Sequence, residues 1–177
     1  MHINPDSVST KDIYRILIST ITPRPIAWVS TVDSQGRVNL APFSFFNVVS
    51  VNPAILGFSP LLNADGQTKD PLNNIRETEG FVINIVSHSL AEKMNQTSAP
   101  YASDVDEMTA AQLTPSTSSV VAAPSVKDAL VHYECSLHDI ICFGEQPLAG
   151  NLVLGDIRHI QLNDSVYDNN RINVAKL

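Results

Sequence analysis

The 177-residue sequence is short of several residue types, and each shortage excludes a class of protein. Two cysteines, Cys135 and Cys142, are too few for the disulfide framework of a small secreted domain. The seven glycines form neither a phosphate-binding loop nor a Rossmann fingerprint. No uninterrupted run of about 18 apolar residues occurs, so no transmembrane helix is predicted. Residues 1–9 are polar and lack the apolar segment of a signal peptide.

Positive charge is also scarce. The 11 Lys and Arg residues against 18 Asp and Glu residues give a formal net charge of −7. A protein that mainly binds nucleic acid or an anionic membrane needs a basic surface, so neither partner is predicted. Hydrophobic residues make up 44% of the chain, which is typical of a folded protein rather than a disordered one. The length predicts a single domain over residues 1–177, and the composition predicts a cytoplasmic protein.

The residue patterns predict a mainly β protein with short helices (α+β). Runs of β-branched and aromatic residues predict strands over residues 26–32, 37–40, 45–51, 54–58, 81–86, 129–141 and 151–162. Helical spacing and capping residues predict helices from residue 10 to the stop at Thr22-Pro23, from residue 70 to Gly80, and over residues 89–95, with a helical stretch within 105–113.

Most of these strands are joined by turns, such as the one predicted at residues 33–36. Strands joined in this way, with only a few short helices, predict a small closed or partly closed β-barrel with helices at its ends. Residues 97–123 are rich in small polar side chains and in proline. A segment of that length is more often a functional loop than a plain connection.

The sequence Thr68-Lys69-Asp70-Pro71 predicts a helix start with Asp70 as the N-cap and Pro71 as the first helical residue. Free backbone N–H groups and about half a positive charge from the helix dipole gather at such a terminus. With Lys69 beside them, they form a site that favours a phosphate or carboxylate group. An ordinary helix cap beside a solvated lysine is the alternative.

A second candidate site is the aromatic stretch 41–47. Pro42 cannot donate a hydrogen bond within a sheet, so an edge or a bulge is predicted there. Backbone groups freed beside three phenylalanines suit a flat polar heterocycle, to which Ser44 and Asn47 could form hydrogen bonds. The alternative is a bulge whose phenylalanines fill the core.

A third candidate is Arg24, held between Pro23 and Pro25 on a stiff extended backbone. A guanidinium presented in this way suits bidentate recognition of phosphate, and a surface salt bridge is the alternative.

Two other clusters of reactive side chains have simpler explanations. His132, Cys135, His138 and Cys142 would share one face of a helix and could bind zinc, but their neighbours favour a strand, which points Cys135 away from both histidines. No metal site is therefore predicted. The acidic stretch 104–107 could bind a cation, but the solvated start of a helix explains it better.

Catalytic signatures based on protein side chains are missing as well. No Gly-x-Ser-x-Gly nucleophile elbow occurs, and no catalytic acid or base is predicted. Without a Rossmann fingerprint, a nicotinamide dinucleotide would have to be a transient substrate.

The motifs nevertheless follow one another in a recognisable order along nearly the whole chain. They are Pro23-Arg24-Pro25 with residues 26–31, residues 39–47, Lys69-Asp70 with Asn74-Ile75-Arg76, residues 81–86, residues 94–101, and Gly155-Asp156-Ile157. In this order they resemble the flavin reductase-like family with an FMN-binding split barrel. That family includes flavoredoxins and the reductase components of two-component monooxygenases.

The resemblance implies a homodimer of split barrels with FMN bound near the subunit interface. The residues implied to line the flavin are Ala41, Phe43, Ser44, Phe45 and Asn47. Lys69 and Asp70 would lie at the phosphate end, where Arg24 is a further candidate. FMN is expected rather than FAD, with NADH or NADPH as a transient substrate.

The activity implied by the resemblance is an FMN-dependent NAD(P)H:flavin oxidoreductase. Hydride would pass from NAD(P)H to the bound flavin, and the electrons would then pass to free flavin, oxygen or a partner such as a monooxygenase or another electron acceptor. An FMN-binding electron-transfer or flavin-carrier protein without NAD(P)H activity is the alternative. A barrel that binds no flavin and acts through its dimer surface is a third hypothesis.

The sequence departs from the family pattern in two places. Pro71 replaces the threonine of the usual Lys-Asp-Thr motif, which removes a hydroxyl that could contact phosphate. The sequence ends at Leu177, where resembling proteins usually continue into a tail containing glycine and tyrosine. Both departures bear on how tightly flavin is held.

Overall fold

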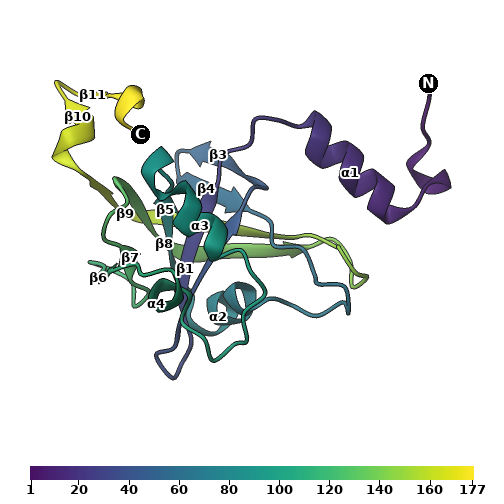
Figure 1. The fold of residues 1–177 in the computed structure, drawn as a ribbon, viewed down its shortest axis with the longest axis horizontal. Coiled ribbons are helices and arrows are strands. Elements are labelled where there is room, and N and C mark those ends of the chain that lie inside the picture. Colours follow the sequence, from purple (N-terminus) through teal and green to yellow (C-terminus); the bar gives the residue numbers. More distant parts are fainter.

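The computed structural model describes residues 1–177 and is built on one seven-stranded antiparallel sheet (Figure 1). Its strands, in the order β2-β1-β5-β8-β9-β4-β3, are β1 (Ala27–Val32), β2 (Val38–Phe43), β3 (Phe46–Val51), β4 (Ala54–Phe58), β5 (Gly80–Ile85), β8 (Val131–Cys142) and β9 (Asn151–Leu162). Two short ladders pair β6 (Pro115–Ser116) with β7 (Ser125–Val126) and β10 (Tyr167–Asp168) with β11 (Arg171–Ile172). The prediction of a mainly β fold with short helices is confirmed.

The two edge strands of this sheet, β2 and β3, are consecutive in the chain. Only the bend at Ser44 and Phe45 separates them. The sheet must therefore curl until its two edges approach each other, which makes a barrel whose wall is not hydrogen-bonded between β2 and β3. The predicted partly closed barrel is confirmed, and we call the opening between these two strands the seam.

Pro42 lies within the edge strand β2, where its missing N–H leaves no ladder bond unmade. The predicted edge is present, but the register between β1 and β2 runs without a bulge from Ala27–Phe43 to Val32–Val38.

The helices are α1 (Thr10–Thr20), α2 (Asp70–Thr78), α3 (Ala91–Gln96) and α4 (Glu107–Ala110). Helix α1 begins as predicted, with the Ser9 hydroxyl accepting the backbone N–H of Asp12 at 3.2 Å. It lies away from the barrel and has no buried residue (Figure 1). The stretch within 105–113 is helical only over α4. No helix of the structure combines the length and apolar character needed to cross a membrane.

The predicted capping of α2 is wrong by one residue. Lys69 is the N-cap and forms no side-chain cap bond, while Asp70 and Pro71 are the first two helical residues. The Asp70 carboxylate accepts a hydrogen bond from the Ser103 hydroxyl at 3.0 Å instead of capping the helix. At the other end, Glu79 adopts the left-handed conformation (φ 54°) and Gly80 already belongs to β5.

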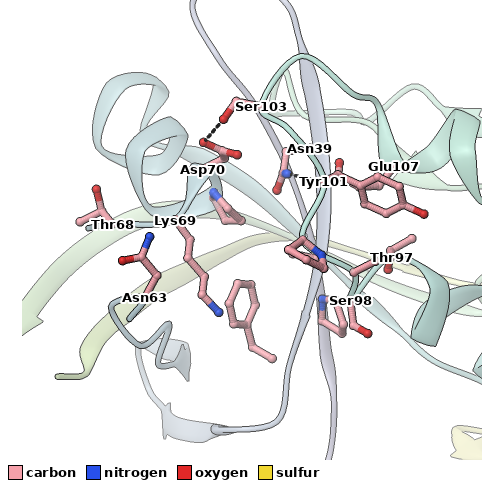
Figure 2. A pocket seen from close by; sticks show the side chains of 16 residues that line it. Asn39, Asn63, Thr68, Lys69, Asp70, Thr97, Ser98, Tyr101, Ser103 and Glu107 are labelled. Carbon is pink, nitrogen blue, oxygen red and sulfur yellow. Dashed lines mark hydrogen bonds between the residues drawn. The ribbon is translucent and has the colours of Figure 1, made fainter. Parts of the chain in front are cut away.

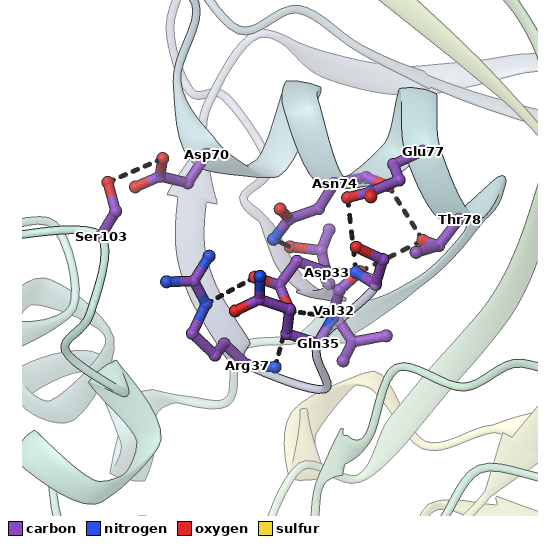
Figure 3. Close-up of polar contacts among 11 residues, drawn as sticks. Val32, Asp33, Gln35, Arg37, Asp70, Asn74, Glu77, Thr78 and Ser103 are labelled. Carbon is purple, nitrogen blue, oxygen red and sulfur yellow. Dashed lines mark hydrogen bonds and ion pairs between the residues drawn. The ribbon is translucent and has the colours of Figure 1, made fainter.

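The hairpin between β1 and β2 is fixed by Asp33 (Figure 3). Its carboxylate accepts the backbone N–H of Gln35 at 2.9 Å, and the backbone N–H and Nε of Arg37 at 2.8 and 2.6 Å. The backbone N–H of Arg37 is the main reason that the pKa of Asp33 lies below its ordinary value. Helix α2 is fastened beside this turn because Thr78 Oγ1 donates to the carbonyl of Val32 at 3.2 Å.

Strand β1 is buried on both faces, which explains its continuous apolar sequence. Ala27 and Val29 belong to the main core with Phe58 and Phe81. Trp28 belongs to a second apolar cluster that includes Leu90 and Met108 from the segments carrying α3 and α4. The long segment 97–123 thus begins by covering the outer face of the barrel, and Trp28 Nε1 donates to Thr97 Oγ1 at 2.8 Å.

The two cysteines have opposite environments, so we expect them to differ in reactivity. Burial raises the pKa of Cys135 to about 12, whereas Cys142 is exposed. The thiolate is the reactive form, so a thiol reagent at mildly alkaline pH should modify Cys142 alone in the folded protein and both residues in denaturant. Ellman's titration measures this, and a Cys142→Ser variant should show no reactive thiol until it is unfolded. Modification of both residues in the native protein would contradict the prediction.

Candidate functional site

A cavity of about 400 Å³ lies beside β2, on the approach to the seam. We call it the seam cavity. It is lined by Asn39 and residues 41–43 of β2, by residues 68–71 at the start of α2, by residues 97–101 and Ser103 of the long loop, and by Asn63 and Glu107. Figure 2 shows Lys69 and Asn63 on one side of this space and Thr97 and Ser98 on the opposite side.

The start of α2 supplies the positive charge of the seam cavity. Lys69 is the only basic residue of the lining, and its ammonium group forms no ion pair or hydrogen bond within the protein. The carbonyl of Lys69 accepts the N–H groups of Leu72 and Asn73 at 3.0 and 3.2 Å, whereas the N–H of Asp70 has no acceptor. A free ammonium, a free N–H and the helix dipole together favour an anionic group.

Hydroxyl groups approach the cavity mainly from the loop. Those of Thr97, Ser98 and Ser103 donate to Met94 O at 2.8 Å, Asn95 O at 2.6 Å and Asp70 Oδ1 at 3.0 Å. Their orientation is therefore fixed. The Ser98 and Ser103 oxygens can each accept a further hydrogen bond, whereas Thr97 Oγ1 already accepts the indole N–H of Trp28. The proline at position 71 leaves α2 without a hydroxyl there, while the Thr68 hydroxyl is already bonded to Asn73 Oδ1 at 2.6 Å.

Glu107 is a buried carboxylate in the cavity wall, only 6% exposed. Its Oε2 accepts the backbone N–H of Leu40 at 3.0 Å, and its Oε1 accepts Nδ2 of Asn39 at 2.6 Å. Burial is the main cause that raises its pKa, and the negative charges of Asp106 and Asp70 raise it further. The prediction of a solvated helix start is therefore wrong for Glu107, because α4 packs this residue against β2, although it describes the exposed Asp104.

The raised pKa of Glu107 gives protein stability a pH dependence whose sign is fixed. A group with a higher pKa in the folded state contributes stability below its unfolded pKa, and that contribution is lost as pH rises through the folded pKa. The ordinary value is 4.5, so the free energy of unfolding of the wild type should fall relative to that of Glu107→Gln as pH rises from about 4 to about 7. Urea titrations of both proteins at several pH values measure this difference, and a constant difference would contradict the prediction.

A second cavity, of about 370 Å³, lies between the end of α1 and the bend that joins β2 to β3. It is lined by Leu17, Ile21, residues 23–25 and residues 44–47. Arg24 forms no salt bridge here. Its guanidinium donates to Ser44 Oγ at 3.2 Å, and to the carbonyls of Ile18 and Ile21 at 2.6 and 2.5 Å, so it holds the end of α1 against the seam.

The structure thus brings the eight predicted site residues together in two groups. Those that line the seam cavity are Ala41, Phe43, Lys69 and Asp70. Those that line the second cavity are Arg24, Ser44, Phe45 and Asn47. The two groups meet at consecutive residues in the bend of the chain. Phe43 borders the seam cavity, and its ring packs in the core against Phe58 at 5.1 Å between ring centroids, so the alternative of a core role holds for this residue.

Several residues of the seam cavity have no role that the sequence predicts. Asn39 and residues 97–101 fall within the ordered motifs, which was the available signal. Glu107 carried no signal, because only its burial against β2 distinguishes it from a surface acid. The residues considered for zinc lie on β8, as the strand prediction required, and no three His, Cys, Asp or Glu side chains of the structure gather in a way that could hold a metal ion.

The sequence model of the flavin reductase like domain matches residues 19–175, which include every strand of the barrel. The chain belongs to the flavin reductase like family. The family resemblance inferred from the ordered motifs is confirmed. YwrF of Bacillus subtilis is 38% identical to this flavin reductase like protein over 165 residues, which cover 92% of this chain and 80% of YwrF.

Solved structures of the same kind agree with the fold. Nitrilotriacetate monooxygenase component B from Bacillus cereus superposes on this flavin reductase like chain with a TM-score of 0.92 at 35% identity, covering 97% of this chain and 86% of that one. The 2-nitrobenzoate 2-nitroreductase NbaA from Pseudomonas fluorescens gives a TM-score of 0.87 at 28% identity, covering 98% and 83%. Family and neighbours together identify a flavin-related oxidoreductase with a split-barrel fold.

Proposed function

We propose that this protein binds FMN in the seam cavity and reduces it with NADH or NADPH, and that the electrons then pass to free flavin, oxygen or a partner protein. One observation carries the proposal. The seam cavity joins an anion-binding end, where Lys69 and the N–H of Asp70 are both unpaired, to a wall formed by the edge strand β2. A flavin mononucleotide has the matching pair of features, a phosphate and a flat polar ring.

The wall of β2 suits a heterocyclic ring because its outer edge has no neighbouring strand. Leu40 donates its N–H away from β1, to Glu107, and alternate residues of an antiparallel strand direct their backbone groups to the same side. The carbonyls of Leu40 and Pro42 therefore face outward as acceptors for ring N–H groups. Ala41 and Pro42 add small apolar surface between them.

The protein's task in this proposal is binding and orientation. When bound, flavin supplies the redox chemistry, because it can accept a hydride from a reduced nicotinamide and pass the electrons on. Lys69 and the start of α2 hold the phosphate, and β2 orients the ring. Arg24, Ser44, Phe45 and Asn47 line the separate second cavity on the far side of the bend, so within this chain they do not share the phosphate end with Lys69.

An absorbance titration with FMN, followed by anaerobic addition of NADH or NADPH, tests the proposal. We expect a perturbed flavin spectrum on binding and bleaching of the flavin band on reduction. Binding without bleaching by either nucleotide would favour the flavin-carrier or electron-transfer alternative. Failure to bind FMN at micromolar protein would overturn the proposal, and a parallel titration with FAD tests the preference for FMN.

We also propose that the protein works as a homodimer, with the second copy covering apolar surface beside the second cavity. Leu17 and Ile21 on the α1 side are 44% and 59% exposed, and Val48 and Val51 on β3 are 60% and 84% exposed. Exposed apolar side chains on two segments that both adjoin this cavity are typical of a surface buried by association. Light scattering should give twice the mass of the 19.2 kDa chain, and a monomer at micromolar concentration would contradict this part of the proposal.

The similarity to nitrilotriacetate monooxygenase component B supports a monooxygenase as one class of electron acceptor. Reduced flavin released by the protein would then be the diffusing species. Oxygen consumption should accordingly continue when free FMN is present in excess over protein and NAD(P)H is supplied.

A further inference from the structure

The buried carboxylate of Glu107 has a position that burial alone does not explain. Strand β2 is a sheet edge, so the outward N–H of Leu40 has no strand to accept it. Glu107, which is 67 positions away in the sequence, accepts this N–H instead. Its other carboxylate oxygen accepts a hydrogen bond from Nδ2 of Asn39, the residue next to Leu40. One carboxylate thus takes the place of a missing strand at this point of the edge.

The segment that Glu107 holds is the wall of the proposed flavin site. Asn39 and residues 41–43 line the seam cavity, and Leu40, which Glu107 bonds directly, lies between them with its side chain in the cluster around Trp28. The position of Glu107 is held by its neighbour Met108, which is 1% exposed and packs in the same apolar cluster as Leu40 and Trp28. The carboxylate therefore connects the apolar cluster around Trp28 to the part of β2 that lines the seam cavity.

We propose that Glu107 is a positioning residue for flavin binding, whose ionised carboxylate fixes the course of residues 39–43 along the seam cavity. The proposal rests on the proposed FMN site. Glu107 acts through β2, because both of its side-chain hydrogen bonds go to Asn39 and Leu40 of that strand.

Protonation should weaken this clamp. An ionised carboxylate accepts with both oxygens, whereas in the neutral acid one oxygen carries a proton and is a poor acceptor. The charged groups that act on Glu107 are Asp106 beside it and Asp70 at the start of α2, while β2 presents only the neutral Asn39 and Leu40. Asn39 Oδ1 is buried without a partner, so the neutral acid has an acceptor available only if the Asn39 amide turns over.

The test is FMN affinity as a function of pH, measured by fluorescence titration for the wild type, Glu107→Ala, Glu107→Gln and the control Asp106→Asn. The control removes one charge from the adjacent residue, whose carboxylate caps α4 and forms hydrogen bonds only with Met108 and Thr109. At pH 7.5 we expect Glu107→Ala to bind FMN at least about tenfold more weakly, Glu107→Gln to lie between it and the wild type, and Asp106→Asn to match the wild type.

The pH profile distinguishes positioning from a purely structural role. FMN phosphate itself titrates near pH 6, so only the ratio between wild type and Glu107→Gln is informative. The ratio of the FMN dissociation constants of Glu107→Gln and the wild type should approach one as pH falls, because protonation of Glu107 makes the wild type resemble the variant. Glu107→Gln is nearly isosteric, so it keeps the proposal testable if Glu107→Ala does not fold.

A second readout needs no flavin. The amide of Leu40 should exchange with solvent more slowly in the wild type than in either Glu107 variant, because the carboxylate is its only acceptor. Equal exchange rates of the Leu40 amide in the wild type and both variants would overturn the inference about Glu107. So would equal FMN affinity of the wild type and both variants, and neither result would affect the proposed function. Absence of FMN binding by the wild type would overturn the proposed function, and the inference about flavin with it.

Discussion

Replacing Lys69 by alanine is expected to weaken FMN binding by about 1 to 3 kcal/mol, roughly 5- to 150-fold in the dissociation constant. Lys69 is the only cation of the seam cavity and has no carboxylate partner within the protein, so its charge is available to a phosphate. The substitution removes a charge-assisted hydrogen bond without opening a core cavity, because Lys69 is exposed. Fluorescence titration of FMN with both proteins measures the change.

The fold should survive this substitution. Lys69 is the N-cap of α2 but makes no side-chain cap bond, so alanine removes no helix-capping interaction. Lys127→Ala is the matched control, because it removes the same charge from an exposed lysine outside the cavity. Equal FMN affinity of Lys69→Ala and the wild type would exclude Lys69 from the phosphate site. Equal weakening in Lys127→Ala would point to net charge instead.

The largest effect on stability is expected for Phe58→Ala, which should lower the free energy of unfolding by about 3 to 5 kcal/mol. Phe58 is fully buried and lies between two other rings, with centroids 5.1 Å from Phe43 and 5.6 Å from Phe81. The space around them is already filled, since a Cβ added at Gly155 would collide with the Phe81 ring. Such a core cannot readily collapse around a deleted ring, so the cavity persists.

Urea unfolding followed by circular dichroism measures this change, with Phe143→Ala as the control. Phe143 is 67% exposed, so its truncation should change stability by no more than about 0.5 kcal/mol. A loss below about 1 kcal/mol for Phe58→Ala would show that the core relaxes around the missing ring. FMN affinity should also fall in Phe58→Ala, because Phe43 lines the seam cavity and loses the ring that supports it.

Most elements of this fold could be predicted because they are set by neighbours in the sequence. The apolar run that became β1, the turn at residues 33–36 and the capped start of α1 each depend on a few adjacent residues. The N-cap of α2 was predicted one residue too late for a reason that sequence could not supply. Asp70 has the right side chain to cap a helix, but Ser103, from the distant loop, engages its carboxylate.

The candidate site also has a part that the sequence predicts and a part that only the fold decides. The motifs predicted a helix start suited to an anion and an aromatic edge strand, and their assignment to flavin stays a prediction that the titrations above test. Whether these residues would share one cavity could not be predicted. Ala41 and Lys69 line the same space, while Arg24 lies in another, because the chain bends at Ser44 and Phe45.

The sequence by itself therefore determined the family and the β-rich architecture, since these follow from local patterns of polarity and turn-forming residues. It also predicted which segments would bind an anion and a flat ring. Only the tertiary structure decided which of those segments face one another, and that Lys69 is left unpaired. It also decided that Glu107, in an acidic stretch typical of a solvated helix start, is buried against Leu40 of an edge strand. Burial and pairing between residues this far apart depend on how the whole barrel packs, and no local pattern encodes them.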